Sequence, residues 1–239
     1  MIEIKNLYVN LNKKEILKNI NIDFEKNKIT AIIGQSGSGK TTLLNTISLI
    51  NENYNGEIFF ENQNIKTIKK DILRKNVGML LQNATPFPMS ILQNLTYAPI
   101  YHGIKDKKVL NNLAINLLKE CNLYDEIKDE LNKSALILSG GQKQRLCIAR
   151  TLSINPKVLL LDEPCSNLDI NNTKIIEKTL LNLVKNHTII IITHNLSQAK
   201  RIANKIVFMQ DGKIIEYGDK NELFNNPKSE KLKEYLKNI

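Results

Sequence analysis

Apolar residues recur along the chain at two spacings, and the change between them predicts which segments are strands and which are helices. In the first 30 residues they fall at near-alternate positions, at Ile2 and Ile4 and again at Ile20, Ile22 and Phe24. Near-alternate spacing is typical of strands that bury one face. We therefore expect the chain to open with antiparallel β-structure.

A short apolar segment, Ile29–Ile33, is expected to be a fully buried strand. It leads through a glycine-rich turn into Lys40–Ile50, where leucines and isoleucines take helical spacing. Further strands are expected over Gly56–Phe60 and Val77–Leu81, and helical patterns dominate over about residues 84–155. This last stretch is expected to form a helical subdomain within a single domain that spans residues 1–239.

Beyond residue 155 the expected elements alternate between strand and helix. The expected strands and helices, in chain order, are Val158–Leu161, Thr173–Lys185, Thr188–Thr193, Ser197–Ala203 and Ile206–Met209. Such alternation is typical of a parallel sheet flanked by helices, so we expect an α/β fold.

The C-terminal segment after these elements is more polar. Asp211-Gly212 predicts a hairpin turn into Lys213–Tyr217, and residues 219–239 are expected to form a charged helical tail. The charge pattern favours a solvated helix for this tail over a docking element.

Composition narrows the class of protein. The 239 residues are 42% hydrophobic and 24% charged, which suits a folded domain with a sizeable core. No apolar run approaches the roughly 18 residues that a membrane-spanning helix needs. The N-terminus lacks the basic and apolar regions of a secretion signal, so we expect a cytosolic protein.

Charge and cysteine content exclude two further classes. The net charge is +10, but only four of the 34 basic residues are Arg and only 5% of residues are aromatic, so no nucleic-acid partner is expected. Cys121, Cys147 and Cys165 are an odd number without Cys-x-x-Cys spacing, which indicates neither a disulfide framework nor structural zinc.

The glycine-rich turn carries the strongest chemical signal. It matches G-x-x-x-x-G-K-[ST] directly after an expected strand and at the start of an expected helix. Glycines let successive backbone N–H groups face a polyphosphate, Lys40 supplies charge to the β- and γ-phosphates, and the Thr41 hydroxyl can ligate Mg²⁺. We expect ATP and Mg²⁺ to bind here. The expected binding residues are Gly34, Gln35, Ser36, Gly37, Ser38, Gly39, Lys40, Thr41 and Thr42.

Acidic, imidazole and amide side chains follow three of the expected strands. Asp162 and Glu163 end the strand that begins at Val158, where carboxylates sit near ligands in open α/β sheets. Asp162 is the expected Mg²⁺ partner, and Glu163 is expected to polarise an attacking water. His194 is expected to contact the γ-phosphate or that water, and Gln82 to touch both metal and water.

One further motif, Leu138-Ser139-Gly140-Gly141-Gln142, is absent from ordinary phosphate-loop enzymes. With it, the chain resembles ATP-binding cassette (ABC) ATPases over essentially its whole length. The resemblance implies a P-loop NTPase fold with an N-terminal antiparallel β subdomain, a RecA-like parallel-sheet core and an inserted helical subdomain. It also implies that Gln82 is the Q-loop residue, that Ser166-Asn167-Leu168-Asp169 is a D-loop and that His194 is the switch histidine.

The same resemblance implies a second copy of the chain as partner. ATP held by the Lys40 loop of one copy is then closed over by the signature residues of the other, which are Ser139, Gly140, Gly141 and Gln142. A Ser-Gly-Gly run that opens a helix offers a hydroxyl, free N–H groups and a positive helix end to the γ-phosphate. Hydrolysis is then expected to open the dimer.

Three segments resemble the phosphate-import branch of the family: Pro86–Ile91, Ser134–Leu136 and Arg145–Arg150. That resemblance implies an ATP-hydrolysing motor peripheral to the cytoplasmic face of the membrane. Its implied partners are two transmembrane permease subunits and an extracytoplasmic substrate-binding protein.

The chain also departs from the family pattern. Asn10 and Leu11 stand where the family carries an aromatic that stacks on adenine, so Tyr8 is the nearest substitute. The segment Ile50–Gly56 is shorter than in the phosphate branch, and Cys165 replaces a frequent Thr.

Three alternatives stay open. The ATPase could serve another solute, such as an amino acid, a metal or an efflux substrate. It could be a soluble ABC protein that acts on nucleic acid, although the chain has neither a second cassette nor a long coiled-coil insertion. A small-molecule kinase would use the same glycine loop but would not need the signature motif.

Overall fold

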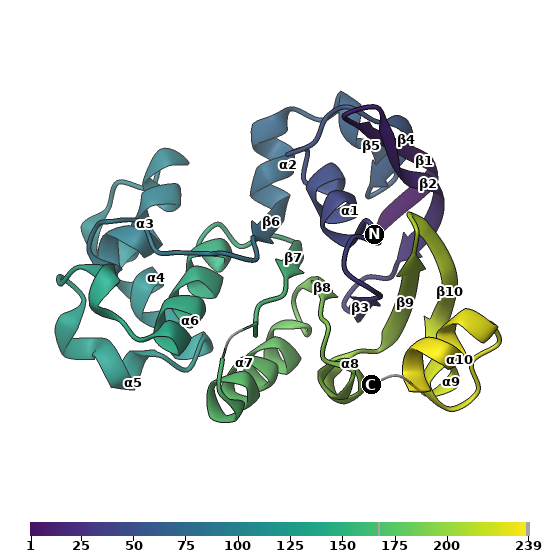
Figure 1. Ribbon diagram of the computed structural model, residues 1–239. Helices are drawn as coiled ribbons and strands as arrows, with labels where there is room; N and C mark the ends of the chain where they lie inside the picture. Colours follow the sequence, from purple (N-terminus) through teal and green to yellow (C-terminus); the bar gives the residue numbers. More distant parts are fainter. Residues whose placement is uncertain (167, 238–239) are drawn as a thin grey trace.

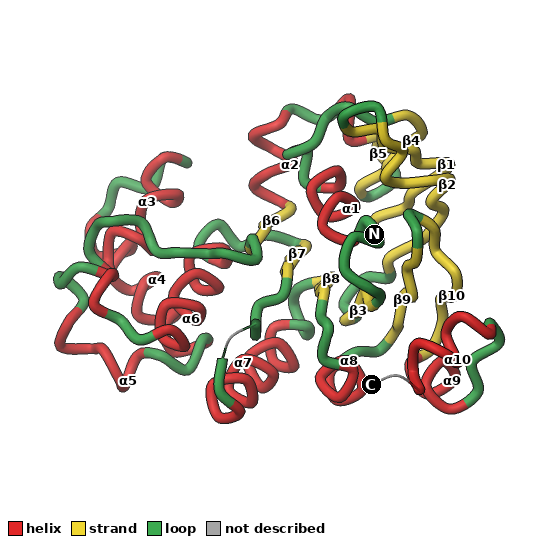
Figure 2. Tube along the Cα trace, in the orientation of Figure 1, coloured by secondary structure: helices red, strands yellow, loops and turns green. Residues whose placement is uncertain are grey.

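The computed structural model describes residues 1–166 and 168–237. Its strands form two sheets, with the helices α3 to α6 gathered on one side of the molecule (Figure 1). Figure 2 shows this division by element type, with the strands concentrated away from that helical group. The α/β fold class predicted from the sequence is confirmed.

The first sheet is antiparallel and has the strand order β2-β1-β4-β5. Its strands are β1 (Ile2–Leu11), β2 (Lys14–Phe24), β4 (Asn55–Phe60) and β5 (Gln63–Asn64). Alternate residues of β1 are buried in its first half, as the spacing of Ile2 and Ile4 predicts.

The second sheet has the order β10-β9-β3-β8-β7-β6 and is parallel except for the antiparallel edge strand β10. Its strands are β3 (Ile29–Ile33), β6 (Val77–Leu80), β7 (Val158–Asp162), β8 (Thr188–Ile192), β9 (Lys205–Gln210) and β10 (Lys213–Asp219). Every residue of β3, β7 and β8 is buried. A parallel strand covered on both faces needs such a continuous apolar run, and the sequence supplies one.

Helices cover the second sheet and build the separate helical group. The helices of eight residues or more are α1 (Lys40–Ile47), α3 (Ile91–Tyr101), α4 (Lys107–Glu120), α6 (Gly140–Leu152), α7 (Ile170–Leu183) and α10 (Glu230–Lys237). The shorter ones are α2 (Lys70–Asn76), α5 (Tyr124–Ile127), α8 (Leu196–Ile202) and α9 (Lys220–Asn225), with 3₁₀ turns at Ile65–Thr67, Lys128–Glu130 and Ala135–Ile137.

Capping decides where several helices begin. Helix α7 starts at Ile170 and not at Thr173 as expected, because the Asp169 carboxylate accepts the backbone N–H of Asn172 at 2.9 Å. The end of helix α1 also differs from the expected position. It ends at Ile47 and not at Ile50, and Leu49 adopts a left-handed backbone with φ 54°.

The C-terminal tail does not match the solvated helix expected from its charges. It forms α9 and α10, and the side chains of Leu223 and Leu232 are buried in the larger hydrophobic core. Charged residues dominate the tail by number, but the two leucines decide how it packs. Among the described residues no helix is both long enough and apolar enough to span a bilayer.

Candidate functional site

The glycine loop predicted to bind phosphate runs from the end of β3 to the start of α1. Gly39 is the N-cap of α1 with φ 97°, and Gly34 leaves β3 with φ 146°. A Cβ at Gly34 would collide with the carbonyl oxygen of Met209, so only glycine fits there. These backbone angles and the close approach of Met209 fix the path of the loop at Gly34.

Lys40 lies under this loop. Its side chain is 5% exposed, and its Nζ donates to the carbonyl oxygens of Gly34 and Gln35, each at 2.8 Å, and to the Ser38 hydroxyl at 3.3 Å. Burial lowers the pKa of Lys40, and the carboxylates of Glu163 and Asp162 offset part of that shift. These contacts hold the Lys40 ammonium beneath the loop, where its positive charge can interact with a bound anion.

Asp162, the last residue of β7, is 1% exposed, and its Oδ1 has no hydrogen-bond partner. Burial raises the pKa of Asp162, and the Thr41 hydroxyl offsets part of that effect. An orphaned buried carboxylate oxygen beside a hydroxyl suits a hard divalent cation such as Mg²⁺. Within residues 1–166 and 168–237, no group of three or more His, Cys, Asp or Glu is placed to hold a metal alone.

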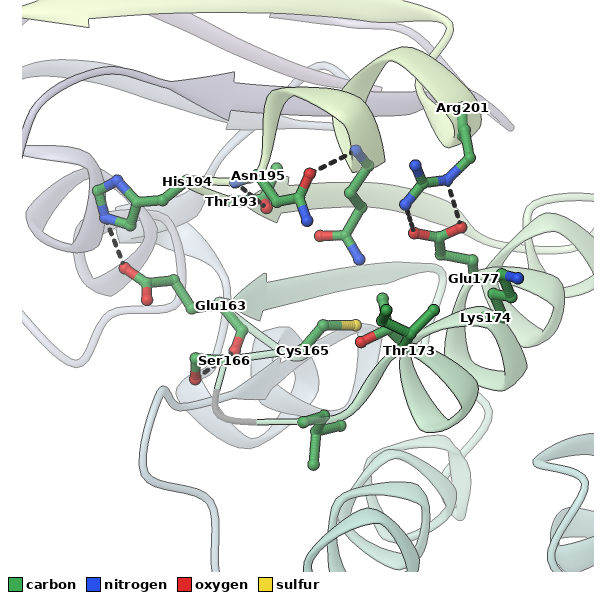
Figure 3. Close-up of a pocket in the computed structure, with 13 residues that line it drawn as sticks. Glu163, Cys165, Ser166, Thr173, Lys174, Glu177, Thr193, His194, Asn195 and Arg201 are labelled. Carbon is green, nitrogen blue, oxygen red and sulfur yellow. Dashed lines mark hydrogen bonds and ion pairs between the residues drawn. The ribbon is translucent and has the colours of Figure 1, made fainter. Parts of the chain in front are cut away.

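Gln82, Glu163 and His194 meet although they are far apart in the sequence. The Gln82 Nε2 donates to Glu163 Oε2 at 3.0 Å. His194 Nε2 lies 2.9 Å from Glu163 Oε1 (Figure 3). The three residues follow β6, β7 and β8, which are neighbours in the sheet. The parallel pairing of β7 with β8 explains why the carboxyl ends of these strands form one site.

The backbone at Glu163 is unusual. Its φ is 49°, in the left-handed region that non-glycine residues seldom adopt, and its N–H donates to the Ile192 carbonyl at 3.1 Å. This turn directs the carboxylate across the sheet edge toward Gln82 and His194. Strain of this kind is common at functional sites because the surrounding structure must hold it in place.

A cavity of about 430 Å³ lies over the glycine loop. Its lining residues are Lys14, Ile16, Ser36, Gly37, Gly39, Lys40, Thr41, Thr42, Gln82, Glu163 and His194. Sequence reasoning missed Lys14 and Ile16, which β2 contributes to this lining. Leu11 pairs with Lys14 across a turn, and the position of Lys14 and Ile16 directly after this turn is the sequence feature that could have indicated them.

Tyr8 was expected to be the nearest aromatic substitute for an adenine-stacking residue. It pairs with Asn55 in β4 and is not among the lining residues.

The signature residues do not line this cavity. Ser139 is the N-cap of α6, where its hydroxyl accepts the Gln142 N–H and Gln142 bonds back to the Ser139 N–H. Helix α6 belongs to the helical group, away from α1 (Figure 1). Within one chain, the glycine loop and the signature helix therefore form two separate surfaces.

An ion pair between the buried Arg145 and the exposed Glu126 fixes the start of α6. Arg145 is 3% exposed and makes two contacts with Glu126, at 2.6 and 2.9 Å. Gln142 also donates to Glu126, at 3.1 Å. Arg145 lowers the pKa of Glu126. The orientation of the signature residues thus depends on a carboxylate in α5.

A second cavity, of about 520 Å³, lies beside the Glu163–His194 contact and between α7 and α8 (Figure 3). It is bounded by Cys165 and by the ion pair of Glu177 with Arg201, whose shortest contact is 2.6 Å. Ser166, expected in the D-loop, donates its hydroxyl to the Glu163 carbonyl at 3.0 Å. Asn167, expected in the same loop, lies outside the described residues, and Asp169 caps α7.

Comparison with known proteins identifies relatives of the whole chain. Residues 17–166 match the family model described as ABC transporter. The Phosphate import ATP-binding protein PstB of Thermotoga maritima is 48% identical over 243 residues, which cover 99% of this chain and 97% of that protein. The protein of the same name from Malacoplasma penetrans is 46% identical and covers 97% of this chain and 83% of its own length.

Solved structures agree with the fold. The ATP-binding cassette MJ0796, solved as a dimer in a post-hydrolysis state with ADP and Pi, superposes with a TM-score of 0.81 at 28% identity and covers 92% of this chain and 98% of its own. A bacterial Atm1-family ABC exporter with ATP bound superposes with a TM-score of 0.87 at 25% identity, over 100% of this chain and 41% of that one.

Proposed function

Because the chain belongs to the ABC transporter family and is an ATPase, we propose that it is the ATP-hydrolysing subunit of an importer for inorganic phosphate. Relatives named as phosphate import ATP-binding proteins at 44–48% identity over nearly the full chain support this substrate. The observation that carries the hydrolytic role is the contact of Glu163 with both Gln82 and His194 beside the glycine loop.

Each residue of this site has a proposed role in hydrolysis. Lys40 and the loop N–H groups neutralise the β- and γ-phosphates. Glu163 accepts the proton of a water that attacks the γ-phosphorus, while the bond from that phosphorus to the ADP oxygen breaks. Gln82 and His194 hold the Glu163 carboxylate in place, and His194 also donates to a γ-phosphate oxygen as the charge on it grows.

Thr41, Asp162 and Gln82 are the proposed holders of Mg²⁺. The unpartnered, buried Oδ1 of Asp162 supports this assignment. When bound, the cation would draw charge from the phosphate oxygens. The chain's own contribution is to fix the direction of the Asp162 carboxylate at the end of β7, next to the Thr41 hydroxyl.

A head-to-tail dimer is proposed as the active state. The signature residues Ser139 to Gln142 do not line the cavity over the glycine loop of their own chain. A second copy would present them to that cavity, with the N-terminal end of its α6 facing the γ-phosphate. The dimeric solved structure of a related cassette with ADP and Pi supports a dimeric assembly.

The membrane partners are proposed to dock on the helical group. Several large apolar side chains are exposed there or in the segment that leads to it, namely Leu81, Phe87, Tyr97, Ile100 and Tyr101. The ring of Phe87 packs edge-on against Tyr97, with centroids 5.9 Å apart, and Arg150 lies 4.1 Å from the Phe87 centroid. A preformed apolar patch of this kind suits a helix of a permease subunit. Binding there would hold the chain at the inner face of the membrane.

Phosphate uptake tests the substrate. Phosphate-starved cells that lack this gene would be given the wild-type chain or Glu163→Gln, and uptake of labelled phosphate would be measured. We expect rescue by the wild type alone. Normal uptake in the deletion strain, with no parallel importer detectable, would contradict phosphate as the solute and leave the ATPase assignment in place.

A further inference from the structure

The hairpin formed by β9 and β10 lies against the phosphate loop. At its turn, Asp211-Gly212, the Gly212 N–H donates to the carbonyl of Ser38 in the loop at 3.2 Å. In β9, the Met209 carbonyl fills the space where a Cβ of Gly34 would stand. The hairpin therefore contacts the phosphate loop near both of its ends.

The same glycine is also bonded to β2. The Lys18 N–H donates to the Gly212 carbonyl at 2.8 Å, which is possible because β2 is an edge strand of its sheet. Gly212 has φ 78°, and a Cβ on it would collide with the carbonyl oxygen of Ile16. One backbone hydrogen bond on each side thus joins Gly212 to the loop and to β2, and the close approach of β2 leaves no room for a side chain.

Strand β2 and the phosphate loop also approach each other directly. A Cβ on Gly39 would stand 2.7 Å from Cδ2 of Leu17, 3.2 Å from the Ile16 carbonyl oxygen and 3.8 Å from Cα of Gly212. The loop, β2 and the β9–β10 turn therefore meet at one point, and each of them limits the position of the other two.

This junction connects two parts of the cavity lining. The described lining residues fall into three groups, which are the loop with the start of α1, the group around Glu163, and Lys14 with Ile16 of β2. The proposed roles of the first two groups concern the phosphates and the attacking water. The β2 residues are therefore left to contact the base and the sugar, and their distance from the loop depends on the junction at Gly212.

On the basis of the proposed ATPase function, we propose that Gly212 is a positioning residue of the nucleotide site, which sets the distance between the phosphate loop and the β2 residues Lys14 and Ile16. Gly212 itself is not among the described residues that line the cavity, so it acts through Ser38 and through β2. ATP spans both surfaces and depends on this distance. A ligand that meets only the loop does not.

Gly212→Ala tests the proposal because the atoms nearest to the new Cβ belong to the backbone of β2 and not to the loop. The methyl group should push β2 away while the bond to Ser38 persists. We expect Kd for ATP to rise about fivefold to tenfold, as for the loss of most contacts of one apolar side chain. Kd for inorganic tripolyphosphate should change less than twofold. Isothermal titration with each ligand measures both values.

Gly56→Ala is the matched control. Gly56 lies in β4 with φ 96°, and a Cβ on it would collide with the carbonyl oxygen of Asn6 in β1, so the substitution forces the same kind of clash outside the described cavity lining. Both variants should have a lowered Tm, but only Gly212→Ala should lose ATP affinity. The proposal is overturned by unchanged ATP affinity in Gly212→Ala, by an equal loss for tripolyphosphate, or by the same loss in Gly56→Ala.

Amide hydrogen exchange of the wild type keeps the proposal testable if Gly212→Ala does not fold. Saturating ATP should slow exchange of the Lys18 amide at least about threefold, because a ligand bound to both surfaces opposes their separation. Tripolyphosphate should leave that rate unchanged. The same rate with and without ATP would overturn the role of Gly212, whereas a wild type that neither binds nor hydrolyses ATP would contradict the proposed function itself.

Discussion

The two surfaces proposed to enclose ATP are built in different ways. At the phosphate loop, Lys40 bonds to residues only five and six positions earlier, and the loop lies between β3 and α1 in one continuous segment. At the signature helix, Gln142 and Arg145 depend on Glu126, 16 and 19 positions away in α5. The hydrogen bonds of Lys40 are therefore local, whereas the orientation of the signature depends on a residue of another helix.

This difference predicts that substitutions at the two surfaces have different effects on ATP binding. A change in the helical group should disturb the signature and leave ATP binding by a single chain intact. A change at the phosphate loop should weaken ATP binding strongly. The predictions that follow test this division, beginning with the largest expected effect.

Glu163→Gln is expected to slow ATP hydrolysis by about 10² to 10⁴, because the amide cannot accept the proton of the attacking water. The amide keeps the shape of the side chain, so ATP binding should persist and an ATP-bound dimer should accumulate. Steady-state phosphate release and size-exclusion chromatography with ATP would show both effects. Unchanged turnover would remove Glu163 from this role.

Lys40→Ala and Ser139→Ala together test whether two copies share each site. Lys40→Ala should weaken ATP binding by about 100-fold through the loss of charge-assisted contacts, whereas Ser139→Ala should leave ATP binding by the single chain unchanged. Each variant alone should hydrolyse ATP poorly. Mixing the two should restore part of the activity, because one of the two sites in the mixed dimer is then intact.

Ser90→Ala is the matched control for Ser139→Ala. Ser90 caps α3 with the same reciprocal pair of bonds, to Gln93, and lies outside the proposed site. Both substitutions should cost about 1 kcal/mol of stability, but only Ser139→Ala should impair hydrolysis. If mixing Lys40→Ala with Ser139→Ala restores nothing, the shared site is contradicted.

Glu126→Gln should loosen the signature helix. Glu126 is 41% exposed, so we expect a loss of only about 1 to 2 kcal/mol in unfolding free energy at pH 7. Arg145 lowers the folded-state pKa of Glu126, so its stabilisation is complete above the unfolded pKa and is lost as pH falls through the folded pKa. The difference between wild type and variant should therefore shrink on acidification below about pH 4.

Urea unfolding at pH 7 and at acid pH measures this effect. Glu130→Gln is the control, because Glu130 pairs with Lys133 on the surface at 2.9 Å and should change stability by less than about 0.5 kcal/mol. Equal effects of the two substitutions, or a gap that persists in acid, would contradict the proposed importance of the Glu126–Arg145 pair.

Leu11→Tyr is expected to have the smallest effect of these substitutions, and it should strengthen ATP binding. Leu11 is exposed and pairs with Lys14, which lines the phosphate-loop cavity together with Ile16. A tyrosine ring there would stack on the base and raise ATP affinity about twofold to tenfold, with no change for inorganic tripolyphosphate. Leu11→Met, which adds no ring, is the control. Equal gains for ATP and tripolyphosphate would contradict base stacking.

Much of this architecture was predictable because it is local. The apolar run Ile29–Ile33, the glycine loop and the helix beginning at Lys40 follow one another in the sequence and in the structure. Predicted helix ends were less accurate, as at Thr173, because a single capping side chain such as Asp169 can extend a helix beyond its apolar pattern.

The tertiary structure alone decided which distant residues meet. The strand order places the ends of β6, β7 and β8 side by side, and this brings Gln82 to Glu163 across 81 positions. It also decided that α10, expected to be solvated, packs against β9. Sequence patterns report which face of an element is apolar, but the partner of that face depends on the order in which strands pair. The sequence therefore determined the chemistry at each strand end, and the fold determined that these ends form one site.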